Sequence, residues 1–265
     1  MSKVVLITGA SSGIGKALAI EAGRKGYSVC MMARTESSLL EVQQLLQKVP
    51  TFIFAGNVKN EVDCQQFIAL SAKKFGKIDI LINNAGISMR ALFKDADLQV
   101  LKELMDVNFW GSVYCTKYAL PYLLETKGSV VGVSSIAGFK GLPARTGYSA
   151  SKFALQGFLE SLRIENLKTG LHVLVACPGY TESNIRKSAL NETGKAQGET
   201  PLNEGKLMSS EEVAKHLWKA IDQRKKYLIL TLQGKMAVFL NKISSRLTDI
   251  LTYNVIKKEP NSPFQ

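Results

Sequence analysis

Short runs of apolar residues alternate with longer stretches of helical periodicity through the first 230 residues of the chain. The short runs are rich in Val, Ile and Leu, and turn-forming residues follow several of them, which is typical of β-strands. They lie at residues 3–8, 27–33, 51–55, 78–82, 129–134, 171–177 and 226–230. Helical spacing between the runs predicts helices, the clearest over residues 35–48, 60–75 and 98–125. The pattern therefore predicts strands and helices in alternation.

Beyond residue 233, one apolar stripe at helical spacing predicts a single amphipathic helix. Its members are Met236, Phe239, Leu240, Ile243, Leu247, Ile250 and Leu251. Such a helix can pack in the core or on a second subunit, cap a pocket, or lie on an anionic membrane surface. Packing is the simplest of these readings. We expect the last residues, 259–265, to be frayed.

A polar, glycine-containing segment over residues 183–208 predicts a long loop, of the kind that closes over a substrate or remains disordered. The next helix has a clear start, because Ser209 and Glu212 have the spacing of a capping box. His216 lies within that amphipathic helix, and we interpret it as a structural residue.

Composition excludes several classes of function. The formal net charge is +12, but the basic residues are spread along the chain and no nucleic-acid-binding motif accompanies them. Only 2 histidines and 4 scattered cysteines are present, so we expect reduced thiols and no catalytic metal. No secretory signal precedes residues 3–8 and no apolar run is long enough to cross a membrane, which favours a cytoplasmic protein. Peripheral membrane contact through residues 234–265 stays open.

The segment at residues 8–15, TGASSGIG, joins a strand to a helix through a glycine-rich turn. Glycines let the backbone approach a ligand closely, and a helix N-terminus directs N–H groups at an anion. The spacing is a variant of the dinucleotide fingerprint and predicts a phosphate-binding corner. Its candidate contacts are Gly9, Ser11, Ser12, Gly13, Ile14 and Gly15.

The second strand ends at Ala33, where dinucleotide-binding folds usually place an acidic residue for the ribose hydroxyls. Arg34 follows instead. A guanidinium suits a 2′-phosphate in charge and in geometry. We therefore expect NADP(H) to be preferred over NAD(H), with a solvated surface arginine as the alternative.

Tyr148 and Lys152 are four residues apart in a predicted helix, so their side chains share one face. An ammonium beside a phenol stabilises the phenolate, and we expect the pKa of Tyr148 to lie below its usual value. Ser135, at the end of the preceding strand, can polarise a carbonyl held in front of the tyrosine. These are the parts of a proton-transfer site for a C=O or CH–OH group, although an isolated pair of this spacing is usually an ordinary surface pair.

Two further motifs complete the pattern. NNAG, at residues 83–86, follows a strand, and its small residues leave room for a flat ligand against the backbone. Asn108 lies inside a predicted helix, where asparagine is disfavoured without a solvent-exposed face or a specific role.

Taken in order, TGASSGIG, NNAG, Asn108, Ser135 and YSASK (residues 148–152) resemble the classical short-chain dehydrogenase/reductase family over residues 3 to about 230. The resemblance implies a Rossmann-type α/β fold with a doubly wound, seven-stranded parallel sheet in a single domain. We expect a catalytic domain over 1–233 that includes the 183–208 loop, followed by an extension over 234–265. The resemblance also implies a homodimer or homotetramer.

The resemblance implies roles for the matching residues. Tyr148 is expected as the catalytic acid/base, Lys152 as its neighbour and the ligand of the nicotinamide ribose, Ser135 as the substrate-orienting hydroxyl, and Asn108 as the anchor of a water relay from the lysine. NADPH would deliver hydride to a carbonyl carbon while Tyr148 protonates the oxygen. The other expected cofactor contacts are Asn57, Val58, Asn84, Ala85, Gly86, Pro178, Gly179 and Thr181.

The chain departs from the family at two places. Asn57 stands where many members have an aspartate. After Gly179, the family often has an aliphatic residue and then a threonine, whereas Thr181 and Ser183 fill these places here.

On the substrate side, Arg145 and Tyr180 are candidate contacts with Ser135 and Tyr148. The sequence looks closest to members that act on hydrophobic lipid or steroid-like ketones. A 3-oxoacyl thioester or 3-ketosphingoid reductase is the alternative, in which Arg145 would face an anionic substrate. A non-catalytic NADP(H)-binding scaffold is the alternative of another class, although such a protein is expected to lack Tyr148 or Lys152.

Overall fold

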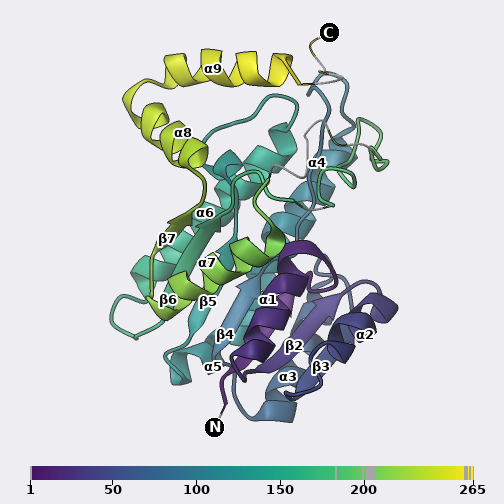
Figure 1. Cartoon of the computed structure of the whole chain (residues 1–265), viewed down its shortest axis with the longest axis vertical. Coiled ribbons are helices and arrows are strands. Elements are labelled where there is room, and N and C mark those ends of the chain that lie inside the picture. Colours follow the sequence, from purple (N-terminus) through teal and green to yellow (C-terminus); the bar gives the residue numbers. More distant parts are fainter. Residues whose placement is uncertain are drawn as a thin grey trace.

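The computed structural model describes residues 2–182, 184–198, 200, 207–259, 262 and 264. One parallel sheet of seven strands forms its centre, in the order β3-β2-β1-β4-β5-β6-β7 (Figure 1). The strands are β1 (Val4–Thr8), β2 (Ser28–Ala33), β3 (Thr51–Ala55), β4 (Ile80–Asn83), β5 (Ser129–Val133), β6 (His172–Cys177) and β7 (Tyr227–Ile229). The seven predicted runs and the predicted fold class are confirmed.

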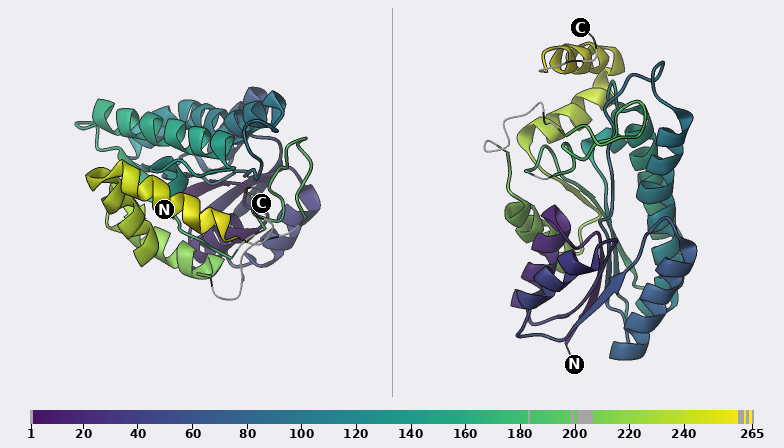
Figure 2. Two further views of the ribbon diagram at one scale, coloured as in Figure 1. Left: turned by 90° about the horizontal axis from the view of Figure 1, so that it is seen from above. Right: turned by 90° about the vertical axis from the view of Figure 1, so that its right-hand side faces the viewer.

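Helices cover both faces of the sheet (Figure 2). One face carries α1 (Gly13–Arg24), α2 (Glu36–Gln44) and α7 (Ser210–Asp222), and the other carries α3 (Glu61–Phe75), α5 (Gly111–Glu125) and α6 (Thr146–Glu165). The helix α4 (Leu98–Met105) packs against α6. The five inner strands are buried on both sides because alternate side chains enter two separate cores: Val5 and Ile7 enter one, and Val4 and Leu6 the other. The predicted capping box of Ser209 and Glu212 opens α7.

The strand order changes direction between β1 and β4, which pair with each other. At such a switch point the connections leave to opposite faces, and a crevice opens beyond the carboxyl ends of the two strands. The motifs at residues 8–15 and 83–86 follow these two strands directly. The topology therefore brings them to one edge.

The predicted helix over 98–125 is interrupted. A π-helical segment, η1 (Asp106–Trp110), separates α4 from α5 and contains Asn108. A π turn inside an α-helix is uncommon and is often found at functional sites. Asn108, inside this turn, makes the buried hydrogen bonds described below.

The prediction of a single helix beyond residue 233 is wrong, because α8 (Leu232–Ile243) and α9 (Ser245–Lys257) are separate helices. Ser244 has an extended backbone, and its side chain accepts a hydrogen bond from the N–H of Leu247, which starts α9. Figure 1 shows both helices at the end of the molecule away from the N-terminus. None of the helices described is long and apolar enough to cross a membrane.

The apolar stripe of α8 and α9 faces outward. Phe239 is 64% exposed and Ile243 is 67% exposed, so the stripe does not pack in the core of this chain, and packing on a second subunit stays a prediction. Within the tail that was expected to be frayed, Glu259 and Ser262 are buried, and residues 260, 261, 263 and 265 lie outside the described residues. Ser262 donates a hydrogen bond to the carbonyl of Ile256, the last buried residue of α9.

Candidate active site

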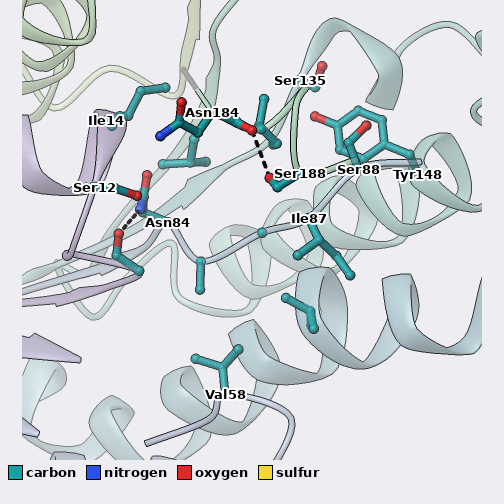
Figure 3. Close-up of a pocket in the computed structure, with 18 of the residues that line it drawn as sticks. Ser12, Ile14, Val58, Asn84, Ile87, Ser88, Ser135, Tyr148, Asn184 and Ser188 are labelled. Carbon is teal, nitrogen blue, oxygen red and sulfur yellow. Dashed lines mark hydrogen bonds between the residues drawn. The ribbon is translucent and has the colours of Figure 1, made fainter. Parts of the chain in front are cut away.

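A cavity of about 580 Å³ lies at the carboxyl edge of the sheet. Residues 9–15 form one end, which we call the glycine end, and Ser135, Arg145 and Tyr148 form the other, the tyrosine end. Every residue that the sequence singled out for cofactor, substrate or catalysis lines this cavity except Asn108, which lies behind its wall. Figure 3 shows Ser12 and Asn84 at one end and Ser135 and Tyr148 at the other.

The glycine end requires glycine for geometric reasons. Gly9 and Gly13 have φ angles of 65° and 51°, which side chains rarely adopt. A Cβ atom on Gly9 would lie 2.8 Å from the Cα of Ala85, and one on Gly15 would lie 2.1 Å from the carbonyl oxygen of Gly9. Ser12 precedes α1 without a side-chain cap, so the first N–H groups of the helix stay available to a ligand. This cradle fits the phosphates of a dinucleotide.

The β4 turn is fastened to the glycine end. The side-chain amide of Asn84 donates to the carbonyls of Thr8 and Gly9, at 3.0 and 3.1 Å. The hydroxyl of Thr8 accepts hydrogen bonds from the N–H groups of Asn84 and Ala85, both at 3.1 Å. Thr8 is a positioning residue that sequence reasoning missed, although it opens the TGASSGIG motif.

The adenine side of this end is more exposed. Arg34 lines the cavity and forms no ion pair with any residue in the described part of the chain. Asn57 is held in a turn, since its backbone N–H donates to Asp63 at 2.8 Å and its side-chain oxygen accepts from the N–H of Lys59 at 3.2 Å. Val58 is buried beside it.

Asn108 is fully buried and uses its side-chain amide completely. Its Oδ1 accepts from the N–H of Ile87 at 2.8 Å, and its Nδ2 donates to the carbonyl of Ile87 at 3.0 Å and to the hydroxyl of Ser151 at 2.9 Å. The amide therefore ties the segment after β4 to α6. The sequence showed that Asn108 needed a solvent-exposed face or a specific role, and the structure gives it buried hydrogen bonds.

Tyr148 and Lys152 share one face of α6, as predicted, with the Lys152 Nζ 5.7 Å from the centre of the Tyr148 ring. The predicted lowering of the pKa of Tyr148 by the lysine is wrong for this structure. Burial raises the pKa of Tyr148, while a hydrogen bond with Ser135 and the charge of Arg145 oppose the rise. The reason is that the Lys152 amine donates to the carbonyl of Val133 at 2.9 Å instead of reaching the phenol oxygen. Burial lowers the pKa of Lys152 to about 8.

Ser135 lies directly after β5 and opens the short 3-10 turn η2 (Ile136–Gly138), where its hydroxyl accepts from the N–H of Ala137 at 3.2 Å. Gln156 supports this position from α6. Its amide donates to the hydroxyl of Ser134 at 2.9 Å and to the carbonyl of Ser135 at 3.3 Å. Sequence reasoning missed Gln156, which is one turn beyond Lys152 on the same helix face and was detectable by that spacing.

After β6, Pro178 and Gly179 line the cavity, and a Cβ atom on Gly179 would lie 2.6 Å from the hydroxyl of Thr231. Thr181 is buried, and its hydroxyl donates to the carbonyl of Gly179 at 3.2 Å. Thr181, which fills the place of the family's aliphatic residue, therefore lines the cavity, whereas the place of the family's threonine belongs to Ser183. Ser183, the other residue expected there, lies outside the described residues.

Three charged or aromatic side chains shape the tyrosine end. Arg145 precedes α6, is buried, and lies 3.5 Å from a carboxylate oxygen of Glu259. Tyr180 lines the cavity and is 39% exposed. Arg186 also lines it and donates to the carbonyl of Thr181 at 2.6 Å. Arg145 was expected at the mouth of the pocket, but its contact with Glu259 was not foreseen.

A doubly wound parallel sheet with a glycine-lined cavity at its switch point defines the Rossmann class of nucleotide-binding proteins. Residues 3–194 match the family model described as short chain dehydrogenase. The chain therefore belongs to the short-chain dehydrogenase family, as the motifs predicted. Proteins of this family bind a nicotinamide cofactor and act on alcohol or carbonyl groups.

Named relatives support this assignment. The 11-beta-hydroxysteroid dehydrogenase-like 2 of Arabidopsis thaliana is 41% identical over 187 residues, which are 69% of this chain and 60% of the relative. The 11-beta-hydroxysteroid dehydrogenase A of Arachis hypogaea is 38% identical over 206 residues, 76% of this chain and 58% of the relative. The match thus spans about three fifths of the length of these curated relatives.

Among solved structures, a short-chain dehydrogenase from Streptomyces avermitilis matches with a TM-score of 0.82 and 26% sequence identity. The match covers 96% of this chain and 98% of that one. The structural similarity therefore extends over nearly the whole of both chains.

Proposed function

We propose that this protein is an NADP(H)-dependent oxidoreductase that interconverts ketones or aldehydes with alcohols, on hydrophobic lipid- or steroid-like substrates. One observation carries the proposal: a single cavity joins a glycine end that fits a dinucleotide to a tyrosine end with a phenol and a hydroxyl. The lysine of the same helix face lies beside them.

The cofactor would lie along the cavity from the glycine end. Residues 9–15 would hold its phosphates, and Gly86 would leave room for its nicotinamide ribose, since a Cβ atom there would lie 3.4 Å from the Lys152 Nζ. When bound, NADPH supplies a hydride for carbonyl reduction. Arg34, which has no acidic partner among the described residues, would bind the 2′-phosphate.

Tyr148 would move the proton. In the reducing direction its hydroxyl donates the proton to the substrate oxygen, while Ser135 donates a hydrogen bond to the same oxygen. Release of the proton leaves a phenolate, which burial disfavours and the hydrogen bond with Ser135 and the positive charges of Arg145 and Arg186 favour. Asn108 would position Lys152 and Tyr148 through its hydrogen bond to Ser151 of the same helix.

The substrate proposal rests on the lining of the tyrosine end. Ile87, Leu142 and Leu190 line the cavity there, and such apolar walls favour a hydrophobic substrate. The hydroxysteroid names of the relatives point the same way. The alternative, a 3-oxoacyl thioester or 3-ketosphingoid, is favoured by Arg145 alone, and its guanidinium is already engaged by Glu259.

The proposal is tested with purified protein, NADPH and NADH, and a panel of steroid ketones, aliphatic ketones and a 3-oxoacyl thioester. Steady oxidation of NADPH with the steroid or aliphatic ketones is expected, with the thioester slower. Arg34→Ala is expected to weaken NADPH binding about tenfold and to leave NADH binding unchanged, because the 2′-phosphate loses one charged partner. No oxidation with any carbonyl compound would favour the scaffold alternative.

A further inference from the structure

The C-terminal extension returns to the segment between β5 and α6 at two places. The first is Lys140, a buried residue whose Nζ donates to Asn241 Oδ1 at 3.0 Å and to Asp249 Oδ1 at 2.5 Å. The side-chain amide of Asn241 in turn donates to the carbonyl of Phe139 at 3.1 Å. These contacts hold α8 and α9 against the chain just after Ser135, away from the cavity lining.

The second place is Glu259, directly after α9. Its Oε2 lies 3.3 Å from the Nη2 of Arg90 and 3.5 Å from the Nη2 of Arg145. The three side chains are only 5% to 11% exposed. A carboxylate is rarely buried to this degree unless cations compensate it, so the end of the chain is placed by these two arginines.

The contact changes the charge that the cavity presents. Arg145 lines the tyrosine end three residues before Tyr148, whereas Arg90 and Glu259 lie behind it. Arg186 also lines this end. The one carboxylate among the described lining residues is that of Glu103, which is paired with Lys59 at 2.6 Å. Glu259 is therefore the acid that offsets the charge of Arg145.

The charges of Arg145 and Glu259 both affect the pKa of Tyr180, another residue that lines the cavity. Burial raises the pKa of Tyr180, and on top of this the charge of Arg145 lowers the pKa while that of Glu259 raises it. Both charges thus act on the tyrosine end, with opposite signs.

We infer that Glu259 is a specificity-determining residue, which fixes Arg145 in the cavity wall and offsets its charge so that the tyrosine end admits uncharged carbonyl compounds over carboxylate-bearing ones. The inference rests on the proposed function and deepens it. Loss of the carboxylate leaves the positive charge of Arg145, in the cavity wall, without the acid that it contacts, and the pocket then favours an anionic substrate.

The test uses a matched pair of ketones, 4-acetylbenzoate and its methyl ester, bound to the full chain loaded with NADP⁺, which has no hydride to transfer to them. Dissociation constants are measured by calorimetry for wild type, Glu259→Gln and Asp249→Asn. Glu259→Gln is expected to shift the ratio of the two constants about fivefold in favour of the carboxylate, since one charge is uncompensated. Asp249→Asn loosens the same extension at Lys140 without altering the lining, and its ratio is expected to stay within about twofold of wild type.

Equal changes for both ketones in Glu259→Gln, or no change, contradict the inference and leave Glu259 a purely structural residue. A shift of the same size in Asp249→Asn contradicts it as well, because loosening alone would then explain the effect. If wild type binds neither ketone but oxidises NADPH with the steroid ketones, the inference fails and the proposed function stands. If wild type neither binds the two ketones nor oxidises NADPH with the steroid ketones, the inference and the proposed function both fail.

Discussion

The glycine end and the tyrosine end of the cavity differ in the kind of contact that holds them together. At the glycine end, the backbone and uncharged side chains of two short motifs hold each other, as when Asn84 bonds the carbonyls of Thr8 and Gly9. At the tyrosine end, the wall residue Arg145 is paired with Glu259, at the far end of the chain. The glycine end is rigid by geometry, whereas the tyrosine end depends on charge balance.

This difference fits a division of labour within one fold. A common cofactor presents the same phosphates to every member of a family, so the same backbone conformation can bind it in each member. Substrates differ, and the tyrosine end is lined by the segment after β5 and the turn after β6, with Glu259 of the C-terminal extension behind Arg145. Charged side chains at that end can change specificity without disturbing the sheet.

The largest effect is expected at the tyrosine end. Tyr148→Phe removes the hydroxyl that would donate the proton, and turnover of the best ketone is expected to fall about 10³-fold. NADPH affinity, measured by calorimetry on the same preparation, is expected to stay within about twofold of wild type. Retained turnover would show that another group supplies the proton.

The glycine end is expected to respond in the opposite manner. Gly15→Ala places a Cβ atom 2.1 Å from the Gly9 carbonyl oxygen, so the backbone must shift where the phosphates would lie. The dissociation constant for NADPH is expected to rise about 100-fold, or about 2.7 kcal/mol. Gly157→Ala is the matched control, because its Cβ would meet open space in α6. Similar affinities in the two variants would contradict the cradle.

A smaller effect is expected from the buried lysine. The pKa of Lys152 is about 8 when folded and near its ordinary value when unfolded. Between these values the unfolded state binds more protons, so stability rises with pH. From pH 8 to pH 10, the free energy of unfolding of wild type is expected to rise by about 1–2 kcal/mol relative to Lys152→Met. Urea unfolding of both proteins measures this, with exposed Lys73→Met expected to follow wild type. If the difference in the free energy of unfolding between wild type and Lys152→Met does not change with pH, burial does not lower the pKa of Lys152.

The sequence predicts the glycine end well because the device is local. Gly9, Gly13 and Gly15 are close together in one strand-to-helix turn, and the apolar run before them identifies the strand. The face shared by Tyr148 and Lys152 is equally local, since helical periodicity alone places them together. All seven strands were predictable for the same reason.

What the sequence could not show depends on contacts between distant residues. Asn108 of the π turn bonds Ile87 and Ser151, neither of which is a helical neighbour. Burial raises the pKa of Tyr148, and the Lys152 amine donates to the carbonyl of Val133 on another element. Spacing puts two side chains on one face but does not choose their partners. In the same way, Glu259 looks like part of a loose terminus until the fold brings Arg90 and Arg145 to it.

The most direct test of the central claim follows the hydrogen that is transferred. Wild-type protein is incubated with a steroid ketone and NADPH that carries deuterium at both hydrogen positions of the nicotinamide C4, and the product is analysed by mass spectrometry. The account predicts an alcohol with one deuterium on the former carbonyl carbon, and no such product from Tyr148→Phe under the same conditions. Unchanged ketone from the wild type, or an alcohol without deuterium, would contradict it.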